Sequence, residues 1–387
     1  MHGDIKAYMG TPNPHSMFVR LTDSSELISI INSLKATSPG GDDISGNIVK
    51  QSMSDPFLSA LTHTVNLSLS QGVFPSKIKI ARVIPIYKKG DKSNISNYRP
   101  ISVLSYFSKI FERIMYNRLS DFLTKHKIIY EYQFGFRAGH SASQALICLV
   151  DKIISAYENN KFVLGLFLDL SKAFDTVNHG ILLQKLDHYG IRGCASSWLS
   201  SYLSGREQYV VVNGAESDPG VISCGVPQGS ILGPLLFILY INDLTNVSSI
   251  LDPILYANMI IVGDNVDLII QTMNSELSHV TNWLNINKLS LNVDKTHHVV
   301  FSPGRKNPLP HQQLIINKQV VTREQSTTFL GVKIDSKLKW QDHILHIKKK
   351  IAKNVGILSR ARHILKFSTL RNLYFSFIKT ADQLNPL

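Results

Sequence analysis

Apolar residues recur at intervals of three and four along several stretches of the chain. Residues at that spacing face one side of an α-helix, so the pattern predicts amphipathic helices. The stretches that show it are residues 24–34, 57–69, 107–123 and 141–157. In the third of these, Arg113 and Arg118 fall on the polar side of the predicted helix.

Shorter apolar stretches in the middle of the chain predict β-strands. Residues 162–168 are apolar almost throughout, too short for a free helix and rich in Phe, Val and Leu, so they predict a buried strand. Asp169 stands at the end of that strand. Residues 251–255 and 260–262 predict a β-hairpin, and we expect its tip, residues 256–259, to face the end of the strand.

Composition narrows the class of protein. The chain has 387 residues, of which 44% are hydrophobic, and this is typical of a globular protein with two or three subdomains. A formal charge of +13 favours nucleic acid as a partner, with an anionic membrane as the rival. Neither a long apolar run nor an N-terminal signal pattern is found, so we expect an intracellular protein, in the nucleus or the cytoplasm.

The three cysteines, Cys148, Cys194 and Cys224, are far apart and form no CxxC pair. This spacing supports neither a disulfide framework nor a zinc site. We expect each to be a small core residue.

A strand that ends in Asp, opposite a hairpin tip, is an arrangement that polymerases use. Nucleotidyl transfer requires two divalent ions roughly 3.5–4 Å apart, which stabilise the attacking and leaving oxygens. Mg²⁺ prefers oxygen ligands, usually one Asp after a strand and an acidic pair at the facing hairpin.

Blocks of sequence around these elements carry a family resemblance. Residues 167–179, which include Asp169 and Phe174, resemble the first catalytic motif of non-LTR reverse transcriptases. Residues 225–244, which include Gln228, resemble the second motif in sequence and spacing.

The resemblance continues on both sides of these motifs. Residues 84–91 and 97–102 look like the fingers motifs of the family, and residues 283–295 and 329–331 are similar to its later palm motifs. The blocks follow the family's order over about residues 34–340 and are closest to the jockey-like branch of LINE-type elements. Agreement of so many blocks by chance is negligible.

The resemblance implies an α/β (α+β) right-hand polymerase fold. In that fold, fingers are followed by a palm, an antiparallel sheet backed by helices, and by a partial helical thumb. We expect an N-terminal helical extension at residues 1–65, fingers at 66–160, the palm at 161–335 and a truncated basic thumb at 336–387. The short segments before and after the polymerase blocks suggest a fragment of an element's reading frame.

Roles in the first motif carry over by position. Asp169 resembles the family's metal ligand, although an Asp after a strand is often a turn or helix cap. Phe174 resembles the steric gate that selects deoxynucleotides, and the alternative is an ordinary core Phe. Asp175 is expected to cap a helix that starts near Asn178.

Further residues resemble the nucleotide-binding positions of the family. Gln228 resembles the residue that lines the sugar and base of the nucleotide. Lys88, Lys89 and Arg99 resemble the fingers cations that hold the triphosphate, since Arg offers a planar fork to phosphate and Lys a point charge. A solvated basic turn is the alternative for the two lysines.

The third motif departs from the family. The family has Tyr-Ala-Asp-Asp, whereas this chain has Tyr256, Ala257, Asn258 and Met259. Asn258 keeps an oxygen without the charge, and Met259 offers a soft thioether that Mg²⁺ does not favour. Asp264 would lie roughly 16 Å further along an extended strand, too far to replace the lost pair.

These residues lead to two functional hypotheses. The first is an RNA-directed DNA polymerase that uses an RNA template, a DNA primer or target, deoxynucleoside triphosphates and Mg²⁺ or Mn²⁺. With Asn258 and Met259 in the catalytic positions, we expect this copy to be weak or inactive. The second is a non-catalytic nucleic-acid-binding remnant of the element.

The C-terminal part, residues 337–371, has a helical pattern and is strongly basic. Such a helix binds either the phosphate backbone of nucleic acid or a membrane or partner surface. In the polymerase context we expect nucleic acid. The candidate contacts are Lys348, Lys349, Lys350, Lys353, Arg360 and Arg362.

Overall fold

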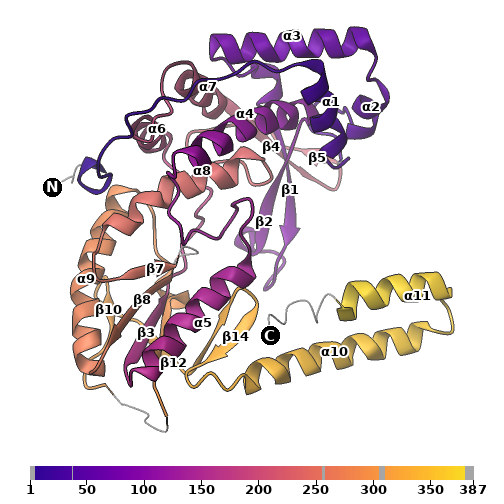
Figure 1. Cartoon of the computed structure of the whole chain (residues 1–387). Coiled ribbons are helices and arrows are strands. Elements are labelled where there is room, and N and C mark those ends of the chain that lie inside the picture. Colours follow the sequence, from indigo (N-terminus) through magenta and orange to yellow (C-terminus); the bar gives the residue numbers. More distant parts are fainter. Residues whose placement is uncertain (1–4, 37, 255–257, 305–309, 380–387) are drawn as a thin grey trace. The chain divides into compact units, whose positions relative to one another are not determined.

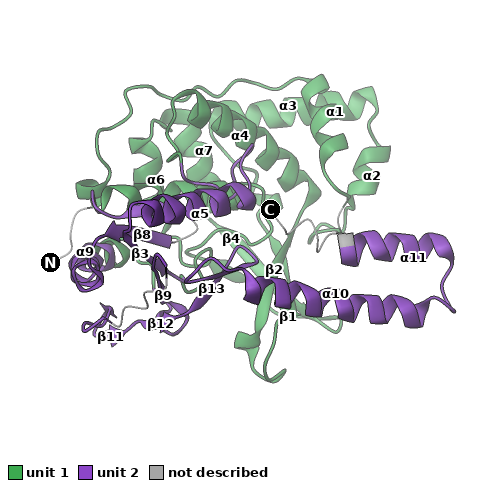
Figure 2. Ribbon diagram, turned by 60° about the horizontal axis from the view of Figure 1, so that its bottom comes forward, with its two compact units in different colours: residues 1–131, 170–247, 282–290 green, residues 132–169, 248–281, 291–387 purple. Residues whose placement is uncertain are grey.

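The computed structural model describes residues 5–36, 38–254, 258–304 and 310–379. They form two compact units (Figure 2), and each unit combines three separate segments of the chain. Unit 1 contains residues 1–131, 170–247 and 282–290, and unit 2 contains residues 132–169, 248–281 and 291–387. The expected α/β class is confirmed, whereas the division into extension, fingers, palm and thumb stays a prediction.

Unit 1 is mainly helical. Three of its helices coincide with predicted amphipathic stretches. The first of these is capped by Asp23, whose side chain accepts a hydrogen bond from the Glu26 amide. The helices are α1 (Ser24–Ser33), α2 (Gly46–Gln51), α3 (Asp55–Gln71), α4 (Tyr106–Lys125), α6 (His179–His188), α7 (Gly193–Leu203) and α8 (Leu232–Ile241).

The sheet of unit 1 joins segments that are far apart in the sequence. It contains β1 (Ala81–Tyr87), β2 (Tyr98–Leu104), β4 (Arg206–Val212), β5 (Ala215–Glu216) and β6 (Gly220–Ile222). The hairpin of β1 and β2 is antiparallel, and β4 runs parallel to β1. Figure 1 shows this sheet next to the helices of the same unit.

One expectation for α4 is wrong. Arg118 is buried instead of facing solvent, and its guanidinium makes an ion pair with Glu26 of α1. A long side chain can place its stem among apolar neighbours when an acidic partner receives its charge. Helical periodicity therefore predicted the helix correctly, but the ion pair with Glu26 on α1 determines that the Arg118 side chain is buried.

The core of unit 1 contains an ion pair. Lys185 of α6 donates to Asp243 at 2.6 Å and to the Tyr240 carbonyl at 2.5 Å, and both charged side chains are almost completely buried. The ammonium also lies over the rings of Tyr240 and Trp283. Burial lowers the pKa of Lys185 to about 8, and the Asp243 carboxylate opposes that shift. The pair joins α6 to the end of α8.

Unit 2 is built around a five-stranded sheet in the order β12-β9-β3-β8-β7. Strand β3 (Phe162–Phe167) lies at its centre, antiparallel to β8 (Asn258–Gly263) and β9 (His297–Phe301). The edge strands are β7 (Asp252–Ile254) and β12 (Thr322–Glu324). The buried strand that the apolar run predicted is thereby confirmed.

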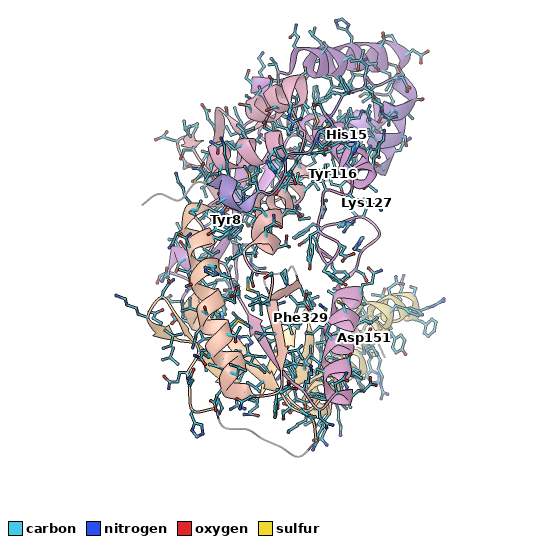
Figure 3. All side chains as sticks on the ribbon, turned by 60° about the vertical axis from the view of Figure 1, so that its left-hand side comes forward. Tyr8, His15, Tyr116, Lys127, Asp151 and Phe329 are labelled. Atoms are coloured by element: carbon cyan, nitrogen blue, oxygen red, sulfur yellow. The ribbon has the colours of Figure 1, made fainter. Side chains whose placement is uncertain are left out.

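Helices cover both faces of this sheet. Helix α5 (Ala142–Glu158) lies on one side and α9 (Val266–Ile286) on the other (Figure 1). Helix α5, Phe167 and Phe329 belong to one hydrophobic cluster. Figure 3 labels Phe329 and also Asp151, an exposed residue of α5.

The rest of unit 2 consists of short hairpins and a helical pair. Strands β10 (Ile315–Ile316) and β11 (Gln319–Val320) form one hairpin, and β13 (Ser326–Phe329) and β14 (Val332–Asp335) form another. Helices α10 (Gln341–Ala361) and α11 (Phe367–Tyr374) follow. In the part of the chain that is described, no helix has the length and apolar character needed to span a bilayer.

The cysteines are free thiols, and the expectation that each is a core residue is wrong for two of them. Cys194 and Cys224 are exposed, and Cys148 is half-buried. Small size and low polarity predict burial only on average, because the surrounding chain decides which side of an element faces the core.

We expect Lys185→Met to lower the free energy of unfolding by about 3–5 kcal/mol, because Asp243 would remain as a buried, unpaired charge. The double variant Lys185→Met with Asp243→Leu should lose clearly less than this, because both charges are removed. Chemical denaturation followed by circular dichroism measures both values. Equal losses in the single and double variants would contradict the interpretation. Arg20→Met, which removes an exposed pair with Asp121, serves as a control with little change.

Candidate functional site

Asp169 lies two residues after the end of β3, and the segment before β9 fixes its backbone. Its carbonyl accepts a hydrogen bond from Asn292 at 2.8 Å, and its amide donates to Thr296 Oγ1 at 3.3 Å. The side chain is 46% exposed. The strand thus holds the backbone in place while the carboxylate remains available to a ligand.

Lys295 is the nearest cation to this carboxylate among the described ion pairs. Its Nζ lies 3.4 Å from Asp169 Oδ2, and its side chain is 61% exposed. Sequence reasoning placed Lys295 inside a palm block but assigned it no role. The two residues are brought together by the pairing of β3 with β9, in which Phe167 lies opposite His297.

Asn258 lines the same cavity as Asp169, but it does not lie at a hairpin tip. It is the first residue of β8 and pairs with Phe167, so the expected four-residue tip is wrong for Asn258 and Met259. Tyr256 and Ala257 lie outside the described residues. Pairing with β3 and β7 extends the strand, because backbone hydrogen bonds are available at Asn258 on both sides.

Met259 faces the opposite side of the sheet from Asn258. Successive side chains of a strand alternate between faces. Asn258 contributes to the cavity beside Asp169, whereas Met259 pairs with the buried Leu166 and is only 2% exposed. The two positions of the third motif are therefore not equivalent, and only Asn258 lines the same cavity as Asp169.

The cavity has a volume of about 330 Å³ and lies wholly within unit 2. Its lining includes polar groups from three strands and from the segment before β9. The polar side chains that matter for its chemistry are those of Asp169, Asn258, Lys295, His297 and Thr327, and Phe329 adds an apolar ring to the lining.

His297 is a positioned residue of this cavity. Its Nε2 lies 2.7 Å from Thr327 Oγ1, and its Nδ1 lies 3.1 Å from the Lys295 carbonyl. The ring stacks on Phe167 with centroids 5.5 Å apart. Because both ring nitrogens have partners, the imidazole supports the cavity wall and would have to break a hydrogen bond to bind a metal ion.

The described groups of the cavity do not fit a pair of divalent cations. One carboxylate and one neutral amide line it, and the Lys295 ammonium lies beside the carboxylate. In the described residues, no cluster of three or more His, Cys, Asp and Glu side chains could hold a metal ion. Asp264 follows the far end of β8, so it adds no charge here. A second carboxylate is the missing element.

Unit 1 holds the candidate nucleotide-binding residues of the two catalytic motifs. Gln228 Nε2 donates to Asp175 Oδ1 at 2.8 Å, and the Val226 amide donates to the Phe174 carbonyl at 2.8 Å. The ring of Phe174 packs on Phe237 of α8 at a centroid distance of 4.9 Å. The two motifs are therefore joined through both backbone and side chains.

The expected role of Asp175 as a helix cap is wrong. Asn178 caps α6 by accepting a hydrogen bond from the Ile181 amide at 3.0 Å. Asp175 instead accepts from Gln228. The Asp175 carboxylate and the Asn178 amide are both suitable helix caps. Only the tertiary contact of Asp175 with Gln228 shows which of the two residues has that role.

The candidate triphosphate-binding cations lie on one hairpin. Lys88 and Lys89 follow β1. Arg99 lies on β2, where it pairs with Ile86 of β1, and all three cations are exposed. The same strand β2 is tied to the second motif, because the Ser102 amide donates to the Gln228 carbonyl at 2.9 Å. The hairpin thus places exposed positive charge on the strand pair that holds Gln228.

The six candidate nucleic-acid contacts lie on or at the end of α10, and all are exposed. The predicted helical stretch is interrupted, because α10 ends at Ala361 and α11 begins at Phe367. Arg362 is the residue that follows α10. No acidic residue faces these cations in the described ion pairs of unit 2.

The chain matches a family model described as reverse transcriptase (RNA-dependent DNA polymerase) over residues 86–334. This range includes Asp169, Asn258, Lys295 and Gln228. The match covers more than half of the chain and includes parts of both units.

Three relatives from Drosophila melanogaster illustrate the similarity. The chain is 30% identical over 351 residues to a probable RNA-directed DNA polymerase from transposon X-element, with 86% of the chain and 38% of the relative covered. It is 29% identical over 353 residues to a probable RNA-directed DNA polymerase from transposon BS, with the same coverage. It is 28% identical over 389 residues to the RNA-directed DNA polymerase from mobile element jockey, with 97% and 42% covered. The chain spans about two-fifths of the length of these relatives.

We expect Met259→Asp to lower the free energy of unfolding by about 3 kcal/mol or more, because it buries a carboxylate against the apolar face of the sheet. Asn258→Asp should lower the free energy of unfolding by only about 1 kcal/mol, because the new carboxylate would lie in a cavity whose Lys295 ammonium partly balances its charge. Urea denaturation of both variants, with Met259→Leu as the control, measures the difference. Equal losses for the two Asp variants would show that the assignment of faces is wrong.

We also expect Mn²⁺ or Mg²⁺ to raise the melting temperature of Asn258→Asp more than that of the natural chain. A ligand that binds the folded state stabilises it in proportion to its affinity, and a second carboxylate supplies the oxygen that the cavity lacks. A thermal melt at increasing cation concentration tests this, with Asn258→Asp combined with Asp169→Asn as the control. An equal shift in all three proteins would place cation binding elsewhere.

Proposed function

The chain belongs to the reverse transcriptase (RNA-dependent DNA polymerase) family, and we propose that it is a non-LTR polymerase domain whose catalytic site has been weakened. The natural activity of such a domain is two-metal nucleotidyl transfer. The observation that carries the proposal is the composition of the cavity beside β3. Asp169 is present there, but Asn258 stands where a second carboxylate is needed.

The charge balance of the cavity supports weak metal binding. Two divalent ions bring four positive charges, which the carboxylates of a polymerase site normally balance. Here one carboxylate faces an ammonium at 3.4 Å, so the pair is already neutral. Loss of a group that only supports a metal ligand typically costs about 10–100-fold in affinity or activity, so loss of a direct ligand should cost at least as much.

We propose the family's substrates as the partners of this domain. These are an RNA template, a DNA primer or target, and deoxynucleoside triphosphates with Mg²⁺ or Mn²⁺. Phe174 would act as the steric gate, Gln228 would line the nucleotide, and the exposed cations of the β1–β2 hairpin would bind its triphosphate. An intracellular location agrees with these partners.

A second candidate function is non-catalytic binding of nucleic acid. Six exposed basic residues on and after α10 favour it, because a row of Lys and Arg side chains can neutralise phosphates without any metal ion. The same surface would serve an active polymerase. Both candidate functions therefore predict nucleic-acid binding by α10, and only the first also predicts nucleotidyl transfer.

We expect the chain as it stands to extend a DNA primer on an RNA template at least about 10-fold more slowly than Asn258→Asp. Primer extension with Mg²⁺ and with Mn²⁺ measures the rates. Asn258→Asp combined with Met259→Asp tests whether the buried position contributes, and Asn258→Asp combined with Asp169→Asn is the inactive control. Comparable rates for the natural chain and Asn258→Asp would contradict the proposal.

We expect the pair of changes Lys349→Gln and Lys353→Gln to weaken binding of a template-primer duplex and to reduce its salt dependence. Each lost phosphate contact should lower the slope of log K against log salt by about 0.9. Fluorescence anisotropy at several salt concentrations gives this slope. Lys35→Gln with Lys77→Gln is the matched control, since these two lysines are also exposed. An equal change in both double variants would show that α10 is not the binding surface.

A further inference from the structure

Glu112 is a buried carboxylate that no step of the proposed chemistry uses. It lies in the middle of α4, and its side chain is completely buried. Its Oε1 accepts a hydrogen bond from Ser108 Oγ at 3.0 Å. A buried carboxylate loses its hydration, and hydrogen bonds within the protein must replace it. The groups that donate these bonds are therefore held in position by the carboxylate.

The second carboxylate oxygen of Glu112 lies at the start of α8. Oε2 accepts from the Ile231 amide at 2.6 Å and from the Leu232 amide at 3.4 Å. The first amides of a helix have no partner within the helix, and the residue before α8 provides no side-chain cap. Glu112 therefore caps α8 from a different helix, and its negative charge is favourable at a helix N-terminus.

The segment that Glu112 caps is continuous with the loop that carries Gln228. Within this loop, Ser230 Oγ donates to the Pro227 carbonyl at 2.8 Å and accepts from the Gly233 amide at 3.0 Å. Gly229 has a φ of +119°, and a Cβ atom there would lie 2.6 Å from the Ser102 carbonyl oxygen. The loop is thus tightly packed against β2 and leaves Gln228 little freedom.

A second buried charge compensates that of Glu112. Burial raises the pKa of its carboxyl group, while the positive charge of Arg206 and the hydrogen bonds from Ile231 and Ser108 oppose the rise. Arg206 is also buried, and its Nη1 donates to the Tyr202 carbonyl at 3.2 Å. Arg206 and these hydrogen bonds favour the ionised carboxylate, which burial disfavours.

We infer that Glu112 is a positioning residue for nucleotide binding, because it anchors the start of α8 and hence the loop at residues 225–230. Through that loop it fixes Gln228 against Asp175 and the backbone of Phe174. It also sets the start of the helix that carries Phe237, the ring behind Phe174. The inference rests on the proposed function, since it assigns these residues to an incoming deoxynucleotide.

The test compares Glu112→Gln with Asp121→Asn, which removes an exposed carboxylate from the same helix. Hydrogen exchange is measured at the amides of Ile231, Leu232 and Gly233. Nucleotide affinity is measured with a chain-terminated primer on an RNA template and the complementary deoxynucleoside triphosphate. Template-primer affinity is measured alone as a third readout.

For Glu112→Gln we expect exchange at Ile231 and Leu232 to be about 10-fold faster, because a neutral acceptor replaces a charged one. The Kd of the nucleotide should rise by a similar factor while that of the template-primer stays unchanged. Asp121→Asn should change none of the three. If Glu112→Gln does not fold, Ser108→Ala removes one bond to the carboxylate and should shift exchange and nucleotide affinity in the same directions by less.

Two results would overturn the inference. One is faster exchange with unchanged nucleotide affinity, which would make Glu112 structural only, and the other is unchanged exchange at the start of α8. Absence of nucleotide binding by the natural chain is a different outcome. It would contradict the proposed function itself, and the inference with it, whereas binding that is equal in the natural chain and Glu112→Gln would contradict the inference alone.

Discussion

The register between β3 and β8 is the constraint on which the candidate site depends. It sets Phe167 opposite Asn258, so that Asn258 and the carboxylate of Asp169 line the same cavity. A shift of one residue would exchange the two faces and bring Met259 into the cavity. Apolar side chains on both faces of β3 oppose such a shift, because it would move each of them into a differently shaped environment.

This arrangement separates ancestry from activity. The strands and the cavity beside Asp169 are held by apolar packing that does not involve a metal ion. An amide can occupy the same space as a carboxylate, so Asn258 is compatible with this fold, and the weakened ion binding that we propose would come from its missing charge. Under the proposed function, the chain keeps the architecture of its family while its catalytic chemistry is weakened.

Unit 1 uses buried polar groups to hold the segments around Phe174 and Gln228. Lys185 and Asp243 connect α6 to the end of α8, and Glu112 caps the beginning of that helix. Buried charges that face a group of opposite charge restrict the geometry, because most other arrangements leave an uncompensated charge. Helix α8 is apolar along its length, so these polar contacts at its two ends define its position more narrowly than apolar packing would.

The amino-acid sequence by itself determined three helices of unit 1, helix α5, the buried strand before Asp169 and the membership in a polymerase family. These follow from local periodicity and from blocks of residues, both of which can be read along the chain. Only the tertiary structure decided that Asn258 belongs to a strand, that Asp175 receives Gln228 instead of capping a helix, and that Lys295 neutralises Asp169. Each of these depends on a partner distant in sequence, and periodicity carries no information about such partners.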